Sequence, residues 1–159
     1  MIKSDTKTTR AETIGKRYML GALSVGLVPF PLVDMGILAG IQLKMLHSLA
    51  KLYGVKFSSE VGKAFIASVL GGGTTFVLSS SVARLAVKSL PAYGWAACLI
   101  GTSVFGGAST YAIGKVFIQH FESGGTFLTF DPRKVKGYYA QQYEEGKEEV
   151  RKSFIGVKP

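Results

Sequence analysis

The sequence is poor in cysteine and in charge, and both shortages limit what the chain can be. A single cysteine, Cys98, excludes an internal disulfide framework and a metal cage built of cysteines. Charged residues make up only 18% of the 159 positions, and the mean hydropathy of +0.27 is high. The 20 glycines follow no three-residue period, which excludes a collagen-like chain. A single domain with a substantial core is therefore expected.

Acidic residues are the scarcer charge, and the formal net charge is +9. An excess of positive charge favours an anionic partner, either a membrane surface or a nucleic acid. The cations flank apolar segments, so we expect a lipid bilayer. Nucleic acid is the less favoured partner, because four glutamates at 144–149 follow directly on the basic and aromatic residues at 133–143.

The chain is organised around residues 29–54, an apolar stretch that opens with a Pro-Phe-Pro break. Proline suits the first helical position, so the sequence predicts a turn followed by a helix from Pro31. Asp34 and Gln42 interrupt its apolar pattern. We hypothesise that Asp34 pairs with Arg84 or Lys88, since a carboxylate at low dielectric is costly when unpaired. The alternative is that Asp34 only complements the dipole of its own first turn.

Two uncharged runs follow, at residues 64–83 and 92–114. As helices they would extend roughly 30 to 34 Å, about the thickness of a hydrocarbon core. Both runs are rich in small residues, which let helices approach closely in lipid. The residues expected at such helix-packing contacts are Ser68, Gly72, Gly106, Thr110 and Gly114.

Three regions are expected: a flexible basic tail at 1–10, an apolar helical-hairpin domain at 11–128 and a polar C-terminal helix and tail at 129–159. Asp131 is a good N-cap and Pro132 a good first residue for a helix ending near 154. The segment FLTFDP before it is expected to be extended. We expect the apolar stripe of this helix to face a partner, through Val135, Tyr139, Tyr143, Val150 and Phe154.

Four stretches together resemble the YcjF-like bacterial family, a domain of unknown function often fused to, or encoded beside, P-loop GTPases. They are PFPLVDMGILAGIQLKMLHSLAKLYGV (29–55), GKAFIASVLGGG (62–73), GGASTYAIGKVFIQHFESGGTF (106–127) and FDPRKVKGYY (130–139). The resemblance covers most of residues 15–147. It implies a helical, membrane-associated module with a P-loop GTPase as a possible partner, and it brings no known catalytic residue.

The chain carries no convincing catalytic or ligand-binding motif, so we expect no enzyme, no cofactor and no metal. The string that ends at Gly114-Lys115-Val116 departs from a phosphate-binding loop, because Ser109 replaces the first glycine and Val116 the hydroxyl. His120 and Glu122 are two residues apart, so they point to different helix faces and have no evident third ligand.

The fold class predicted is all-α: two apolar hairpins, 12–29 with 31–53 and 59–88 with 92–121, plus an amphipathic C-terminal helix. The basic segments place both termini on the cytoplasmic side of a bacterial inner membrane. The expected function is a non-enzymatic membrane protein that docks a P-loop GTPase and forms homo-oligomers. The alternatives are a self-assembling membrane-shaping or pore-forming protein and a soluble helical-bundle interaction module.

Overall fold

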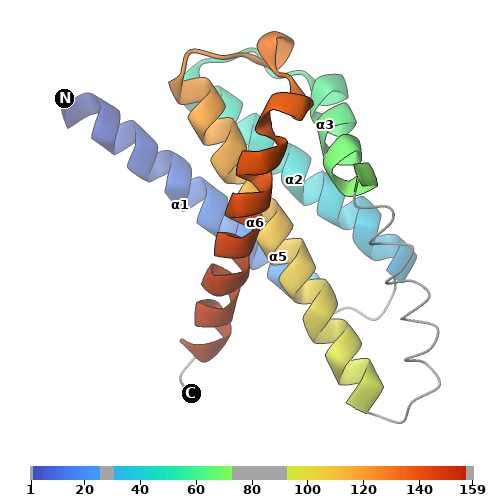
Figure 1. Cartoon of the computed structure of the whole chain (residues 1–159). Helices are drawn as coiled ribbons and strands as arrows, with labels where there is room; N and C mark the ends of the chain where they lie inside the picture. The colour runs from blue at the N-terminus through green and yellow to red at the C-terminus, as the bar shows by residue number, and fades with distance from the viewer. Residues whose placement is uncertain (1, 26–30, 73–92, 157–159) are drawn as a thin grey trace.

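The computed structural model describes residues 2–25, 31–72 and 93–156. In these residues every regular element is helical, so the prediction of an all-α fold is confirmed (Figure 1). The elements are α1 (Ile2–Val25), α2 (Pro31–Tyr53), α3 (Ser59–Gly72), α5 (Tyr93–Glu122), the short 3-10 helix η1 (Phe127–Thr129) and α6 (Pro132–Ile155).

Local sequence signals set several helix ends. Helix α2 begins at Pro31 and ends before Gly54, whose φ of 70° is one that glycine adopts readily. Helix α5 ends in the same way before Gly124, at φ 77°. Helix α6 begins after Asp131, whose carboxylate accepts a hydrogen bond from the Arg133 backbone N–H at 3.0 Å. The predicted N-cap and first residue of α6 are thus confirmed.

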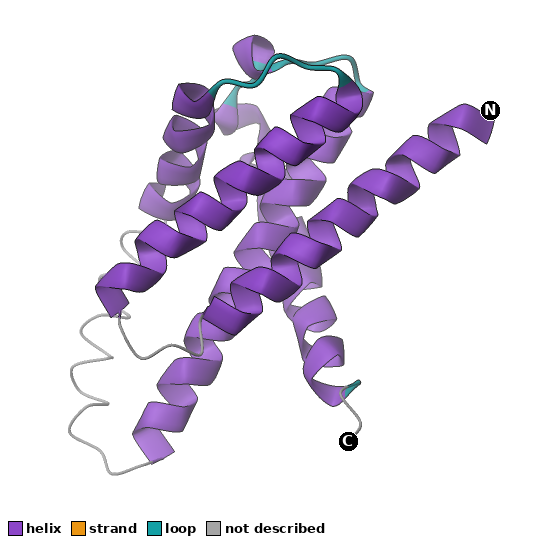
Figure 2. Cartoon of the chain, turned by 180° about the vertical axis from the view of Figure 1, so that it is seen from behind, coloured by secondary structure: helices purple, strands orange, loops and turns teal. Residues whose placement is uncertain are grey.

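Helix α5 is the central element of the bundle. It packs most extensively against α6 on one side and α1 on the other, while α1 and α2 lie side by side (Figures 1 and 2). Helix α3 packs against α2, α6 and η1. The expected hairpin of 59–88 with 92–121 includes residues 73–92, which lie outside the described ranges, so it stays a prediction. Among the described residues, α5 packs mainly against α6 and α1.

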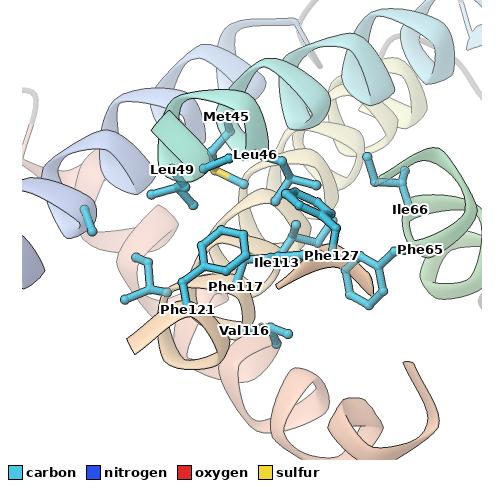
Figure 3. Packing of buried hydrophobic residues seen from close by; sticks show 13 residues of the cluster. Met45, Leu46, Leu49, Phe65, Ile66, Ile113, Val116, Phe117, Phe121 and Phe127 are labelled. Atoms are coloured by element: carbon cyan, nitrogen blue, oxygen red, sulfur yellow. The ribbon is translucent and has the colours of Figure 1, made fainter. Parts of the chain in front are cut away.

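A cluster of aromatic rings fills the core near the C-terminal end of α5 (Figure 3). The Phe117 ring lies 4.6 Å from that of Phe130 and 5.0 Å from that of Phe65. Phe127 of η1 lies 5.4 Å from both Phe117 and Phe121. Because aromatic pairs add roughly 0.5 to 1.5 kcal/mol beyond the area they bury, this cluster stabilises the attachment of α3 and η1 to α5.

Two local predictions are corrected. The segment 1–10, expected to be a flexible tail, is helical from Ile2. Contacts with other helices explain the longer helix, since the Thr8 hydroxyl donates to Glu122 and the Lys7 ammonium lies over the Tyr53 ring. Of the segment predicted to be extended, Phe127–Thr129 forms a 3-10 turn that buries the Phe127 side chain, while Phe130 and Asp131 are extended as expected.

Within the described ranges, no helix has both the length and the apolar character that crossing a membrane requires. The expected crossing at 64–83 extends into residues beyond those ranges. The proposed pairing of Asp34 with Arg84 or Lys88 also lies outside the described side chains.

Candidate functional site

At one end of the bundle (Figure 1), four helices contain segments without charge, and we call these segments together the uncharged end; Asp34, in the first turn of α2, directly precedes one of them. It comprises residues 18–25 of α1, 35–43 of α2, 64–72 of α3 and 93–114 of α5. Three large apolar side chains are exposed there: Leu20 at 47%, Ile37 at 41% and Ile100 at 56%. Exposed apolar side chains on uncharged helix segments form a candidate binding surface, which the charged helix α6 borders where Val150 packs on Met19 and Leu23.

A buried amide cluster lies inside the uncharged end, between α2 and α5. The Gln42 Nε2 group donates to the Ser109 hydroxyl at 3.2 Å and to the Thr110 hydroxyl at 3.3 Å. Both hydroxyls in turn donate to the Gly106 carbonyl. All of these side chains are 0% exposed. The cluster therefore fixes the register of α2 against α5, since any slip would leave amide hydrogens unpaired at low dielectric.

Two acceptors in this interior remain without a partner among the described residues: Gln42 Oε1 and the hydroxyl oxygen of Ser103. The sequence had marked Gln42 as misplaced in an apolar helix, but it gave no partner for the amide. The signal that could have supplied one is the adjacent pair of hydroxyls at 109–110, which follows Gly106 by one helical turn.

Small residues allow α5 to approach its neighbours. A side chain at Gly106 would lie 3.3 Å from the Ala22 carbonyl, and one at Gly114 would lie 3.4 Å from the Met45 sulfur. Thr110 belongs to the amide cluster. The structure thus brings three of the five predicted packing residues to helix contacts within the chain. Ser68 is exposed and donates to the Phe65 carbonyl, and Gly72 is the last residue of α3.

The stripe on α6 that was predicted to face a partner lies mostly against α5 of the same chain. Val150 is 0% exposed and packs with Met19 and Leu23 of α1. The Tyr143 ring lies 6.2 Å from that of Phe105, and Val135 and Tyr139 pack on the aromatic core. Burial raises the pKa of Tyr139. Phe154 alone of the stripe is exposed, at 46%.

Charged groups join the helices at the opposite end. The Lys115 ammonium donates to Glu12 at 2.6 Å, which ties α5 to α1. Burial disfavours the charged form of Lys115, but the hydrogen bond to Glu12 and the electrostatic interactions with Tyr111, Glu12 and Tyr138 together outweigh it and raise the pKa of Lys115. Glu122 accepts hydrogen bonds from the hydroxyls of Thr8 and Tyr53, so three helices meet at one carboxylate.

These polar groups are occupied by structural contacts. His120 Nε2 lies 2.9 Å from the Thr126 carbonyl, and Glu122 receives the two hydroxyls described above. The described side chains include no group of three histidine, cysteine, aspartate or glutamate residues able to hold a metal ion. The candidate site is therefore an exposed apolar surface, with the amide cluster of Gln42 buried beneath it.

The fold and this site define a helical bundle with one uncharged end. Comparison with known proteins shows to which family the chain belongs. Residues 2–148 match a domain of unknown function, DUF697, so the chain belongs to this family. The predicted membership in such a family is confirmed. Magnetosome membrane protein 22 of Magnetospirillum gryphiswaldense is 39% identical over 137 residues, which is 86% of this chain and 70% of that protein. No solved structure matches the chain.

Proposed function

We propose that this protein is a membrane-associated helical module that inserts its uncharged end into the bilayer and docks a P-loop GTPase on its polar end. The observation that carries the first half is the exposure of Leu20, Ile37 and Ile100 on helix segments without charge. The relative named as a magnetosome membrane protein supports the same reading.

The energetics favour insertion. Fully burying one leucine or isoleucine side chain is worth about 1.5 to 3 kcal/mol. Three such side chains, each about half exposed, would gain several kcal/mol on leaving water, and the segments themselves carry no charge, with Asp34 directly before that of α2. The bacterial inner membrane, with both termini cytoplasmic, is the proposed location, because the cations lie towards the other end of α1, α2 and α3.

Carbonate extraction of bacterial membranes tests the proposal. The wild-type chain is expected in the pellet, and the triple variant L20E, I37E, I100E in the supernatant. Leu128 provides the control, because it is 91% exposed but lies on η1, at the opposite end. L128E should therefore remain in the pellet. Release of the wild-type protein by carbonate would refute membrane insertion and would favour the soluble helical-bundle interaction module.

The proposal of GTPase docking rests on the family resemblance and on the polar surface that would stay outside the bilayer after insertion. The outer face of α6 and the connector before α3 expose several cations, among them Lys56, Lys134 and Lys136. Deleting residues 130–159 would not test docking cleanly, because α6 covers α5 and buries Val150.

Charge reversal on the surface tests docking without opening the core. Capture of a P-loop GTPase by the tagged wild-type chain is expected, with loss of capture by K56E, K134E, K136E. A variant of equal charge change, R17E, K44E, K63E, keeps this face intact and should still capture the GTPase. Equal capture by all three proteins would refute docking at this face. The expectation of a homo-oligomer stays a prediction, and chemical crosslinking of the wild-type protein in membranes tests it.

A further inference from the structure

We propose that Arg17, Lys44 and Lys63 form a cationic belt that binds the phosphate headgroups of anionic lipids where the uncharged end enters the bilayer. This inference rests on the proposed membrane insertion and adds the lipid class that the protein would select. It is based on one feature that three helices share: in each, the sequence changes from charged to uncharged at an exposed cation.

The change occurs at one residue in each helix. After Arg17, α1 has no charged residue through Val25, and before Lys44, residues 35–43 of α2 have none. After Lys63, α3 has none through Gly72. Towards the polar end of the bundle, the first charge beyond the uncharged segment is therefore positive in all three helices, while Asp34 precedes the segment of α2 on its other side. Helix α5 repeats the pattern with Lys115, but Glu12 already neutralises that ammonium.

Contacts between the helices show that the three cations lie at one level. The Tyr18 hydroxyl is 3.0 Å from that of Ser48, and the Ser48 hydroxyl donates to the Lys44 carbonyl one turn away. Arg17 and Lys44 are therefore about one helical turn apart along α1 and α2. A side chain at Gly62 would lie 3.0 Å from a terminal methyl of Leu43, so these two residues are close neighbours across α3 and α2. Lys63 and Lys44 are the next residues in the two helices, and they therefore lie at the same level.

The three side chains are exposed and available. Among the described residues, no carboxylate lies within ion-pair distance of Arg17, Lys44 or Lys63. Long basic side chains extend their charge to the headgroup level while their aliphatic parts stay with apolar surface. Helix α6, which is charged along its length, packs on α5 and also meets α1, where Val150 contacts Met19 and Leu23 and Glu149 lies 3.9 Å from Lys16, but its cations are not part of the belt.

A lipid surface explains the arrangement better than a site for free phosphate. The three cations stand on three different helices around the boundary of an apolar surface, and they do not converge on one cavity. Each cation near an anionic membrane surface contributes about 1 kcal/mol, which is about fivefold in affinity. The belt of three should therefore favour anionic over neutral vesicles by about a hundredfold.

Flotation of the full chain with preformed vesicles tests the belt, after dilution from detergent. The vesicles contain phosphatidylcholine alone or phosphatidylcholine with phosphatidylglycerol. The variant R17Q, K44Q, K63Q should lose about a hundredfold in affinity for the anionic vesicles and keep its affinity for the neutral ones. The control K56Q, K134Q, K136Q has the same net charge, and its changed sites lie on the connector and α6. It should bind anionic vesicles nearly as well as the wild type.

The outcomes separate this inference from the function it rests on. Equal loss in the belt variant and the control would show that only net charge matters, and it would overturn the belt. Release of the protein from anionic vesicles by excess inorganic phosphate at constant ionic strength would also overturn it, in favour of a phosphate pocket. Wild-type binding to both vesicle types without preference refutes the belt alone. If the wild-type protein binds neither the neutral nor the anionic vesicles, membrane insertion itself is refuted.

Discussion

Two glycines of α6 should respond in opposite directions to the same substitution. A side chain at Gly146 would lie 2.9 Å from the Ala108 carbonyl oxygen and 3.0 Å from the Ala108 Cα. At Gly137 a new methyl group would meet no atom within 4 Å. Both glycines are inside the helix, so alanine gains about 1 kcal/mol of helix propensity at either position.

The difference comes from backbone atoms, which cannot rotate away as a side chain can. Overpacking of this kind costs about 1 to 3 kcal/mol, and the contact with Ala108 favours the upper part of that range. G137A should therefore raise the free energy of unfolding by up to about 1 kcal/mol. G146A should lower it by about 1 to 2 kcal/mol, because the clash exceeds the gain in propensity.

Thermal unfolding of the two variants and the wild type, followed by circular dichroism, measures the effect. At roughly 2 to 4 °C per kcal/mol for a chain of this size, the two melting temperatures should differ by several degrees. The helical content before unfolding is the control, since both variants must begin from the same fold. Equal melting temperatures would refute the close packing of α6 on α5, because propensity alone gives both substitutions the same sign.

Three further predictions concern polar groups. T110V should cost about 1 to 2 kcal/mol in the wild type, because it leaves an amide hydrogen of Gln42 unpaired, but much less in a Q42L background. Equal costs measured in the two backgrounds by denaturant unfolding would contradict the amide cluster. Above about pH 10 the unfolded chain ionises its tyrosines, while Tyr139, whose pKa is raised by burial, keeps its proton in the folded chain. The free energy of unfolding should therefore fall with rising pH, by at most about 1.4 kcal/mol per pH unit for this group, and less steeply in Y139F. E12Q should destabilise the chain by about 1 kcal/mol, because it leaves the partly buried ammonium of Lys115 without its carboxylate, and the double variant E12Q, K115M should recover part of that loss.

The elements with strong local signals could be predicted from the sequence. Pro31 and Gly54 mark the bounds of α2, and Asp131 with Pro132 marks the start of α6, because capping and proline chemistry act within a few residues. The tail before Ala11 was predicted wrongly for the opposite reason. Its helix depends on contacts such as Thr8 with Glu122, which no local pattern reveals.

The packing order was harder to derive than the helices. Two long uncharged segments close in sequence suggest a hairpin, but the glycines of α5 face other helices. Gly107 lies against Leu23 of α1 and Val150 of α6, which come from the two ends of the sequence. The stripe on α6 was recognised as apolar, yet periodicity alone cannot tell whether such a stripe packs within the chain or on another protein.

For the candidate site, the sequence supplied the unusual residue but not its environment. Gln42 was conspicuous because an amide interrupts an apolar helix, and only the structure shows that Ser109 and Thr110 receive its hydrogens. The exposed Leu20, Ile37 and Ile100 could not be separated by sequence from buried neighbours such as Leu38. The distinction depends on which face each helix turns to α5.

The contact of α1 with α5 also has a consequence for biosynthesis. Glu12 and Lys115, which join these helices, are 103 residues apart in the chain. At about 5 to 20 residues per second, translation would take roughly 5 to 20 s to deliver Lys115 after Glu12 has been made. During that interval the apolar face of α1 has no native partner on α5, and α5 in turn waits for α6. Helix α2, which also packs on α1, is made directly after it and is the first native partner that the nascent α1 can find.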